Sequence, residues 1–176
     1  FTDPPINEER SDRWNIDHVW FNKDESRQWL PNHPKVGDIY DLPEKLNDRL
    51  FRFHLVDNVR GQTLPFAPAE IKSSKIQIEI LEYEKDKMRF KITGSSSAIA
   101  KGEWLLWEND WTPTDLLDHS MTTNLLGEAT YNLSSEKFIE FEIVAIGHRI
   151  GKTKNNGRKH GPDSNYVGFL FKLSQD

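Results

Sequence analysis

The residues with the most chemical potential in this sequence are His54, Asp57 and Arg60, which lie within one short run. A histidine oriented by a carboxylate can act as a general base, and a neighbouring arginine can hold an anionic substrate. The same side chains also suit a structural role, because aspartate in a turn bonds to the nearby backbone and pairs with cations. Polar clusters of this kind occur in structural networks as well as in active sites, and their spacing alone favours the structural role.

Three tryptophans, Trp104, Trp107 and Trp111, form a second candidate site in a segment without a strand pattern. Aromatic faces on loops stack against sugars or cover apolar ligands, and exposed aromatic patches mark interfaces. The alternative is that these rings fill one end of the core. We interpret them as ligand-binding residues, because so many tryptophans in one irregular segment exceed what the packing of an end requires.

The run over residues 152–161 is strongly basic and offers a third candidate, with Lys154 and Arg158 as its ligand-binding residues. Such a run can hold a phosphate, a sulfate or an acidic polysaccharide. Glycines within and beside it favour a mobile, solvated loop as the alternative, and no phosphate-binding glycine-rich motif is present.

The sequence indicates no metal site and no cofactor. Its six histidines lack the close paired spacing of zinc motifs, and it has no cysteine. The acidic residues within 108–118 lack the spacing and the turn glycine of a calcium-binding loop.

The charge and the apolar content of the sequence limit the classes of partner that the protein can bind. The net charge is -5 with no sustained block of one sign, which argues against nucleic acid. No apolar run approaches the roughly 20 residues of a membrane-spanning helix. The chain begins at Phe1, as expected if a preceding segment was removed by signal processing or by the choice of boundary.

Apolar and polar residues alternate with a period of two through the second half of the chain, which predicts antiparallel strands. The alternation predicts two hairpins, a closing strand and further strands in the first half of the chain. Helical spacing of apolar residues and proline positions predict two short helices. The hairpins cover 75–83 with 88–92 and 125–133 with 139–145, and the closing strand covers 167–173; the further strands are expected over 13–21, 36–40 and 51–55, and the helices over 24–30 and 42–50.

These elements predict an all-β fold with one or two short helices, arranged as an antiparallel β-barrel or, alternatively, a two-sheet β-sandwich. Residues 1–12 form a polar, proline-containing stretch and are expected to be a flexible tail. Residues 13–176 then form a single domain, since this length fits one domain and leaves little room for two.

Several short motifs resemble those of an uncharacterised group of exported bacterial β-rich domains. They are Leu42-Pro43, the run from Arg49 to Gly61, Leu126-Gly127 with Tyr131, and the run from Phe138 to Gly147. The resemblance covers about residues 36 to 174. It implies a β fold and export, to the periplasm or outside the cell, and it carries no catalytic residue onto this chain.

The expected function is therefore an exported, non-enzymatic binding module for a carbohydrate, a small apolar molecule or a partner protein. One alternative is a small hydrolase- or isomerase-like enzyme with His54 and Asp57 as its acid–base pair and Arg60 as its anion clamp. Another is a subunit of a larger assembly whose aromatic segment is covered by its partner. The direction in which His54 points separates these hypotheses best.

Overall fold

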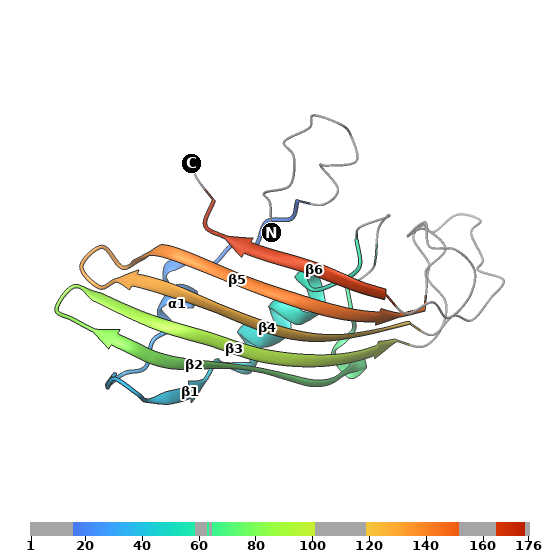
Figure 1. Ribbon diagram of the computed structural model, residues 1–176, viewed down its shortest axis with the longest axis horizontal. Helices are drawn as coiled ribbons and strands as arrows, with labels where there is room; N and C mark the ends of the chain where they lie inside the picture. Colours follow the sequence, from blue (N-terminus) through green and yellow to red (C-terminus); the bar gives the residue numbers. More distant parts are fainter. Residues whose placement is uncertain (1–15, 59–62, 64, 101–118, 152–164, 175–176) are drawn as a thin grey trace.

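The computed structural model describes residues 16–58, 63, 65–100, 119–151 and 165–174. They form one antiparallel sheet of six strands in the order β1-β2-β3-β4-β5-β6, with short helices behind it (Figure 1). The strands are β1 (Ile39–Asp41), β2 (Ile71–Tyr83), β3 (Lys87–Ala100), β4 (His119–Asn132), β5 (Lys137–Ile150) and β6 (Asn165–Lys172). The helices are α1 (Lys23–Arg27), α2 (Glu44–Arg49), the π-helix η2 (Leu50–His54) and the 3-10 helix η3 (Pro68–Glu70).

The two predicted hairpins are confirmed, and both are longer than the alternation indicated. β2 pairs with β3, and β4 with β5, through antiparallel registers that run almost the whole length of each strand. Gly127 shows how closely the interior of the sheet is packed, because a Cβ there would lie 2.2 Å from the carbonyl oxygen of Glu142. Only glycine fits this position, which explains its presence within a strand.

One face of the sheet, which we call the inner face, packs against the helices. Helical and loop residues contribute Trp29, Leu46, Leu50, Phe51 and Leu55 to this core. The strands contribute alternate apolar residues, as the period-two pattern predicts. The main ones are Ile76, Ile78, Ile80, Met88, Phe90, Ile92, Leu125, Ala129, Tyr131, Ile143 and Ala145. The opposite face, which we call the outer face, has no helix against it among the described residues.

The strand expected over 51–55 is wrong: η2 continues directly from α2 and includes His54. The N–H of Leu55 donates to the carbonyl of Leu50 at 3.0 Å, the wider spacing of a π-helix. Phe51 and Leu55 are buried whereas Phe53 is 43% exposed, so the three do not share one face. The apolar spacing of Leu46, Leu50 and Leu55 follows a helical period instead, and this pattern competes with the short alternation.

Two further strand predictions need correction. Residues 16–21, the described part of the strand expected over 13–21, form no strand. Between β4 and β5, the register shifts from Thr130 to Tyr131, so that Thr130 pairs with Glu140 and Tyr131 with Phe138. This irregularity turns Phe138 toward the core and leaves Ile139 45% exposed, although alternation predicted Ile139 on the buried face.

The all-β class is confirmed, whereas closure into a barrel is not shown. Within the described residues β1 pairs only with β2, and β6 only with β5, so the sheet is open at both ends of its strand order. The helices, and not a second sheet, cover its inner face (Figure 1). Among the described helices, none has the length and apolar character needed to cross a membrane.

Candidate functional site

The two ends of the sheet differ in how its strands are connected. At one end, which we call the turn end, β2 and β3 are joined by residues 84–86 and β4 and β5 by residues 133–136. At the other, which we call the loop end, Ala100 pairs with His119 and Arg149 with Asn165. Residues 101–118 and 152–164 therefore leave and rejoin the sheet at the loop end.

The inner face becomes polar toward the loop end. Ser96, Thr123 and Gly147 follow one another across β3, β4 and β5, where the neighbouring row toward the turn end carries Leu125 and Ala145. The Ser96 and Thr123 hydroxyl oxygens lie 2.6 Å apart in a buried hydrogen bond. Such a pair satisfies both hydroxyls, since burying either of them alone costs free energy.

A buried ion pair follows one step further along the strands. The Nε of Arg149 lies 3.2 Å from Oδ2 of Asp57, and the two residues are 3% and 5% exposed. Arg149 occupies an inner-face position of β5, opposite Met121 of β4. Removing two charges from water is costly even when they pair, so hydrophobic packing alone does not account for them.

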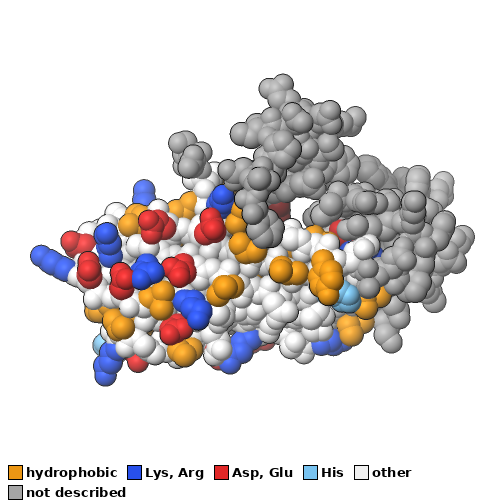
Figure 2. Space-filling model, viewed as in Figure 1, with side chains coloured by type: hydrophobic (Ala, Val, Ile, Leu, Met, Phe, Trp, Pro, Cys, Tyr) orange, Lys and Arg blue, Asp and Glu red, His pale blue; other side chains and the backbone are white. Residues whose placement is uncertain are grey.

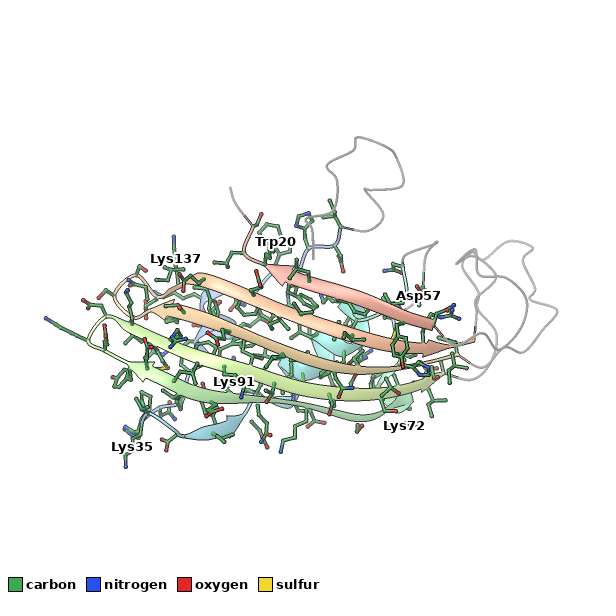
Figure 3. The ribbon with its side chains drawn as sticks, viewed as in Figure 1. Trp20, Lys35, Asp57, Lys72, Lys91 and Lys137 are labelled. Atoms are coloured by element: carbon green, nitrogen blue, oxygen red, sulfur yellow. The ribbon has the colours of Figure 1, made fainter. Side chains whose placement is uncertain are left out.

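The segment after η2 holds Asp57 in this position. Leu55 and Val56 are buried immediately before it. The hydroxyl of Thr63 donates to the Asp57 carbonyl oxygen, and the Thr63 N–H donates to Oδ1 of Asn58 at 2.8 Å. Figure 3 shows Asp57 close to the loop-end tips of β5 and β6. The backbone around Asp57 is thus fixed by its own turn, and the carboxylate points to the sheet.

An aromatic wall lies beside the ion pair. The rings of Phe66 and His119 stack with centroids 5.4 Å apart and an interplanar angle of 25°. Two hydrogen bonds with Arg52 hold Phe66, because Arg52 Nε donates to the Phe66 carbonyl at 2.7 Å and the Phe66 N–H donates to the Arg52 carbonyl at 3.1 Å. Both residues are buried, with exposed fractions of 3% for Phe66 and 8% for His119.

These groups line a depression that we call the loop-end pocket. Its free volume is about 20 Å³, which is enough for one water-sized group. Its walls include Asp57, Thr63, Phe66, His119, Met121 and Arg149. A charged donor, a charged acceptor and an aromatic wall therefore meet in one concave site, the arrangement that orients small polar ligands.

Two residues of the predicted cluster, His54 and Asp57, have different partners among the described residues. His54 lies on η2, and its Nδ1 is 2.7 Å from Oδ2 of Asp17, which comes from the segment before α1. Asp57 pairs with Arg149 instead. Arg60 lies outside the described residues.

The other predicted ligand-binding residues also lie outside the part of the chain that the structure describes. They are Trp104, Trp107, Trp111, Lys154 and Arg158. One of these segments ends just before His119 and the other begins just after Gly151, and both His119 and Gly151 line the loop-end pocket. For metal binding, no group of three or more suitable side chains occurs within the described ranges.

Arg149, His119 and Phe66 were not predicted from the sequence. One signal was available for Arg149, because continuing the alternation of Ile143 and Ala145 places Gly147 and Arg149 on the same buried face. A charged residue at the end of such a series indicates a buried partner. Nothing local to Phe66 or His119 indicates their stacking.

The chain was also compared with known proteins. No protein-family model matches the sequence, and no solved structure matches the fold.

Proposed function

We propose that this protein is a carbohydrate-binding module and that the loop-end pocket receives one hydroxyl group of a bound sugar. The observation that carries the proposal is the Asp57–Arg149 ion pair, which lies buried in the wall of a concave site. A core needs no charges at this place, and two buried charges cost more than the apolar residues that could replace them. Polar groups that are retained at such a cost are expected to serve recognition.

The chemistry of the pocket suits an uncharged polar ligand. The carboxylate accepts hydrogen bonds and the guanidinium donates them, and each sugar hydroxyl can do both. Because Asp57 and Arg149 neutralise each other, the pocket requires no charge on its ligand. The stacked Phe66 and His119 rings add an apolar side to the pocket, against which a C–H group next to the bound hydroxyl can pack.

The predicted role of the tryptophan segment agrees with this ligand class. Trp104, Trp107 and Trp111 belong to the connection that ends at His119, a pocket residue, and exposed tryptophan faces suit sugar stacking. Lys154 and Arg158 belong to the connection that starts after Gly151, another pocket residue. The sequence resemblance supports export, which would bring the module to extracellular or periplasmic glycans.

A panel of neutral mono- and oligosaccharides, titrated calorimetrically into the full chain, tests the proposal. We expect at least one sugar to bind, and binding to weaken at least tenfold in Arg149→Lys, which keeps the charge and loses the planar fork of donors. Arg89→Lys is the matched control, because Arg89 pairs with Glu82 and Glu128 on the outer face. Circular dichroism of both variants verifies that they fold.

Two results would contradict the proposal. One is the absence of binding by every sugar in the panel. The other is a sugar affinity that changes equally in the Arg149 and Arg89 variants, since the ligand would then bind elsewhere. The enzyme alternative has no comparable support, because His54 and Asp57 have different partners.

A further inference from the structure

Met121 of β4 lines the loop-end pocket and is 3% exposed. It lies on the inner face, where it pairs with Arg149 of β5. Its thioether extends over Gly147, because a Cβ at Gly147 would lie 2.6 Å from the Met121 sulfur and 3.1 Å from Cε2 of Phe169. The Met121 sulfur therefore fills space that is available only because residue 147 is a glycine.

The row of inner-face residues that contains Gly147 is polar. Thr123 pairs with Gly147 on one side and with Ser96 on the other. The hydroxyl groups of Ser96 and Thr123 are buried and bond to each other, and neither residue is among the described residues that line the pocket. Since the Met121 sulfur lies over Gly147, the Met121 side chain separates the pocket from these two hydroxyls.

The pocket is small enough to discriminate between ligands. A free volume of about 20 Å³ accepts one water-sized group, so a hydroxyl oxygen fits and a hydroxymethyl or acetamido group does not. Methionine is unbranched and flexible, and it fills irregular gaps of this kind. A side chain, and not the backbone, therefore sets the limit of the pocket on the side of Gly147.

We propose that Met121 selects the ligands of the loop-end pocket by size. Its thioether forms a floor that admits a hydroxyl group and excludes larger substituents. The inference rests on the proposed function and names the class of sugar: one that presents a ring hydroxyl to the pocket, where its 2-acetamido derivative is rejected. A shorter side chain at this position would join the pocket to the Ser96 and Thr123 hydroxyls, so larger polar substituents could enter.

Two simple alcohols test the size of the pocket without a sugar. Methanol and 2-propanol are titrated into the full chain, and the Nε–H resonance of Arg149 in the NMR spectrum reports their entry. In the unaltered protein we expect methanol to shift this resonance and 2-propanol to leave it in place. In Met121→Ala, 2-propanol should bind about tenfold more tightly than in the unaltered protein, because its additional carbon groups can then be buried.

The other methionine of the chain provides the matched control. Met88 is 1% exposed and lies in the core on β3, where it pairs with Tyr131 near the turn end. Met88→Ala removes the same atoms from a buried position away from the pocket. Its response to both alcohols should equal that of the unaltered protein. Circular dichroism of both variants verifies that they fold.

Gly147→Ala changes the pocket in the opposite direction. The added methyl group meets the flexible Met121 thioether and pushes it toward the pocket, so the shift caused by methanol should be lost. Gly168→Ala is its control, because no atom lies within 4 Å of the added Cβ. Gly168 is an outer-face residue of β6, and Figure 2 shows that face, with charged side chains gathered toward the turn end.

Comparison of each sugar with its 2-acetamido derivative separates this inference from the proposed function. Met121→Ala, but not Met88→Ala, should gain binding of the derivatives. If sugars bind and Arg149→Lys weakens them, but Met121→Ala keeps the size preference, size selection is overturned and the proposed function stands. If the alcohols respond as expected and no sugar binds, size selection stands and the proposed function fails. Equal responses to 2-propanol in Met121→Ala and the unaltered protein would also overturn the inference.

Discussion

The turn end and the loop end of the inner face are built on the same strands and have opposite chemistry. At the turn end, Trp29 packs edge-on against Phe21, Phe138 and Phe141, with ring centroids 5.8, 6.1 and 5.4 Å apart. At the loop end, the corresponding space holds the Asp57–Arg149 ion pair and the Ser96–Thr123 hydroxyl pair. The first arrangement maximises buried apolar contact. In the second, the removal of polar groups from water costs free energy.

This difference indicates that the two ends of the sheet have different roles. Burial of aromatic rings supplies stability, and edge-to-face pairs add to it. A buried ion pair contributes little net stability in comparison with apolar residues of similar size. We therefore expect the turn end to stabilise the fold and the loop end to carry the recognition chemistry.

The largest expected effect is that of Trp29→Ala at the turn end. Trp29 is fully buried, so the change leaves a large cavity and lowers the free energy of unfolding by about 4 kcal/mol. Urea unfolding monitored by circular dichroism measures it. The matched control is Trp20→Ala, which removes a ring that is 70% exposed and should change stability by no more than about 0.5 kcal/mol. Equal losses of unfolding free energy in the two variants would contradict the stabilising role of the turn end.

The ion pair at the loop end is expected to show a smaller and non-additive effect. Arg149→Met alone removes the guanidinium that pairs with the buried Asp57 carboxylate and should destabilise the fold by about 3 kcal/mol. Arg149→Met combined with Asp57→Leu should recover most of this loss, because apolar residues replace buried ion pairs at little cost. Urea unfolding of both single variants and the double variant gives the coupling. If the loss of unfolding free energy in the double variant equals the sum of the two single losses, the ion pair is needed for stability. That result would contradict the different roles assigned to the two ends.

The smallest expected effect is an alkaline sensitivity at the turn end. The Tyr40 hydroxyl donates to the Trp29 carbonyl at 2.5 Å, and burial raises the pKa of Tyr40. Below pH about 10 the hydroxyl is neutral in the folded and the unfolded chain. Above it, the unfolded chain ionises while the folded chain stays neutral, so stability falls as pH rises. Urea midpoints at pH 8 and near pH 11 should therefore differ less in Tyr40→Phe than in the unaltered protein; an unchanged difference would exclude Tyr40 as the cause. Burial also raises the pKa of Tyr131, so part of the alkaline loss should remain.

The turn end could be predicted from the sequence because its determinants are local. Alternating residues such as Ile76, Ile78 and Ile80 predict which face of a strand is buried. A short turn predicts that the two strands it joins pair with each other. The exceptions have physical causes. A bulge turned Phe138 inward in place of Ile139, and a helical spacing that begins with Leu46 competed with the alternation around Phe53.

The loop end could not be predicted because its contacts join distant parts of the chain. Asp57 follows a helix in the first third of the sequence, whereas Arg149 lies near the end of β5. Proximity in sequence suggested His54 as the partner of Asp57, but the π-helix directs His54 to Asp17. Only the sheet register, set far away at the turns, brings Arg149 beside the segment after η2.

The order of the strands also has a kinetic consequence. Each strand from β3 to β6 lies beside the one synthesised just before it, so the sheet can grow in step with the ribosome. The short turns let β2 with β3, and β4 with β5, zip together quickly, since closing a small loop costs little chain entropy. The strand residues of the pocket, such as Met121 and Arg149, lie at the far tip of the β4–β5 hairpin, so we expect them to come together last. We expect them also to be the first to separate in a thermal fluctuation, which would open the loop-end pocket without global unfolding.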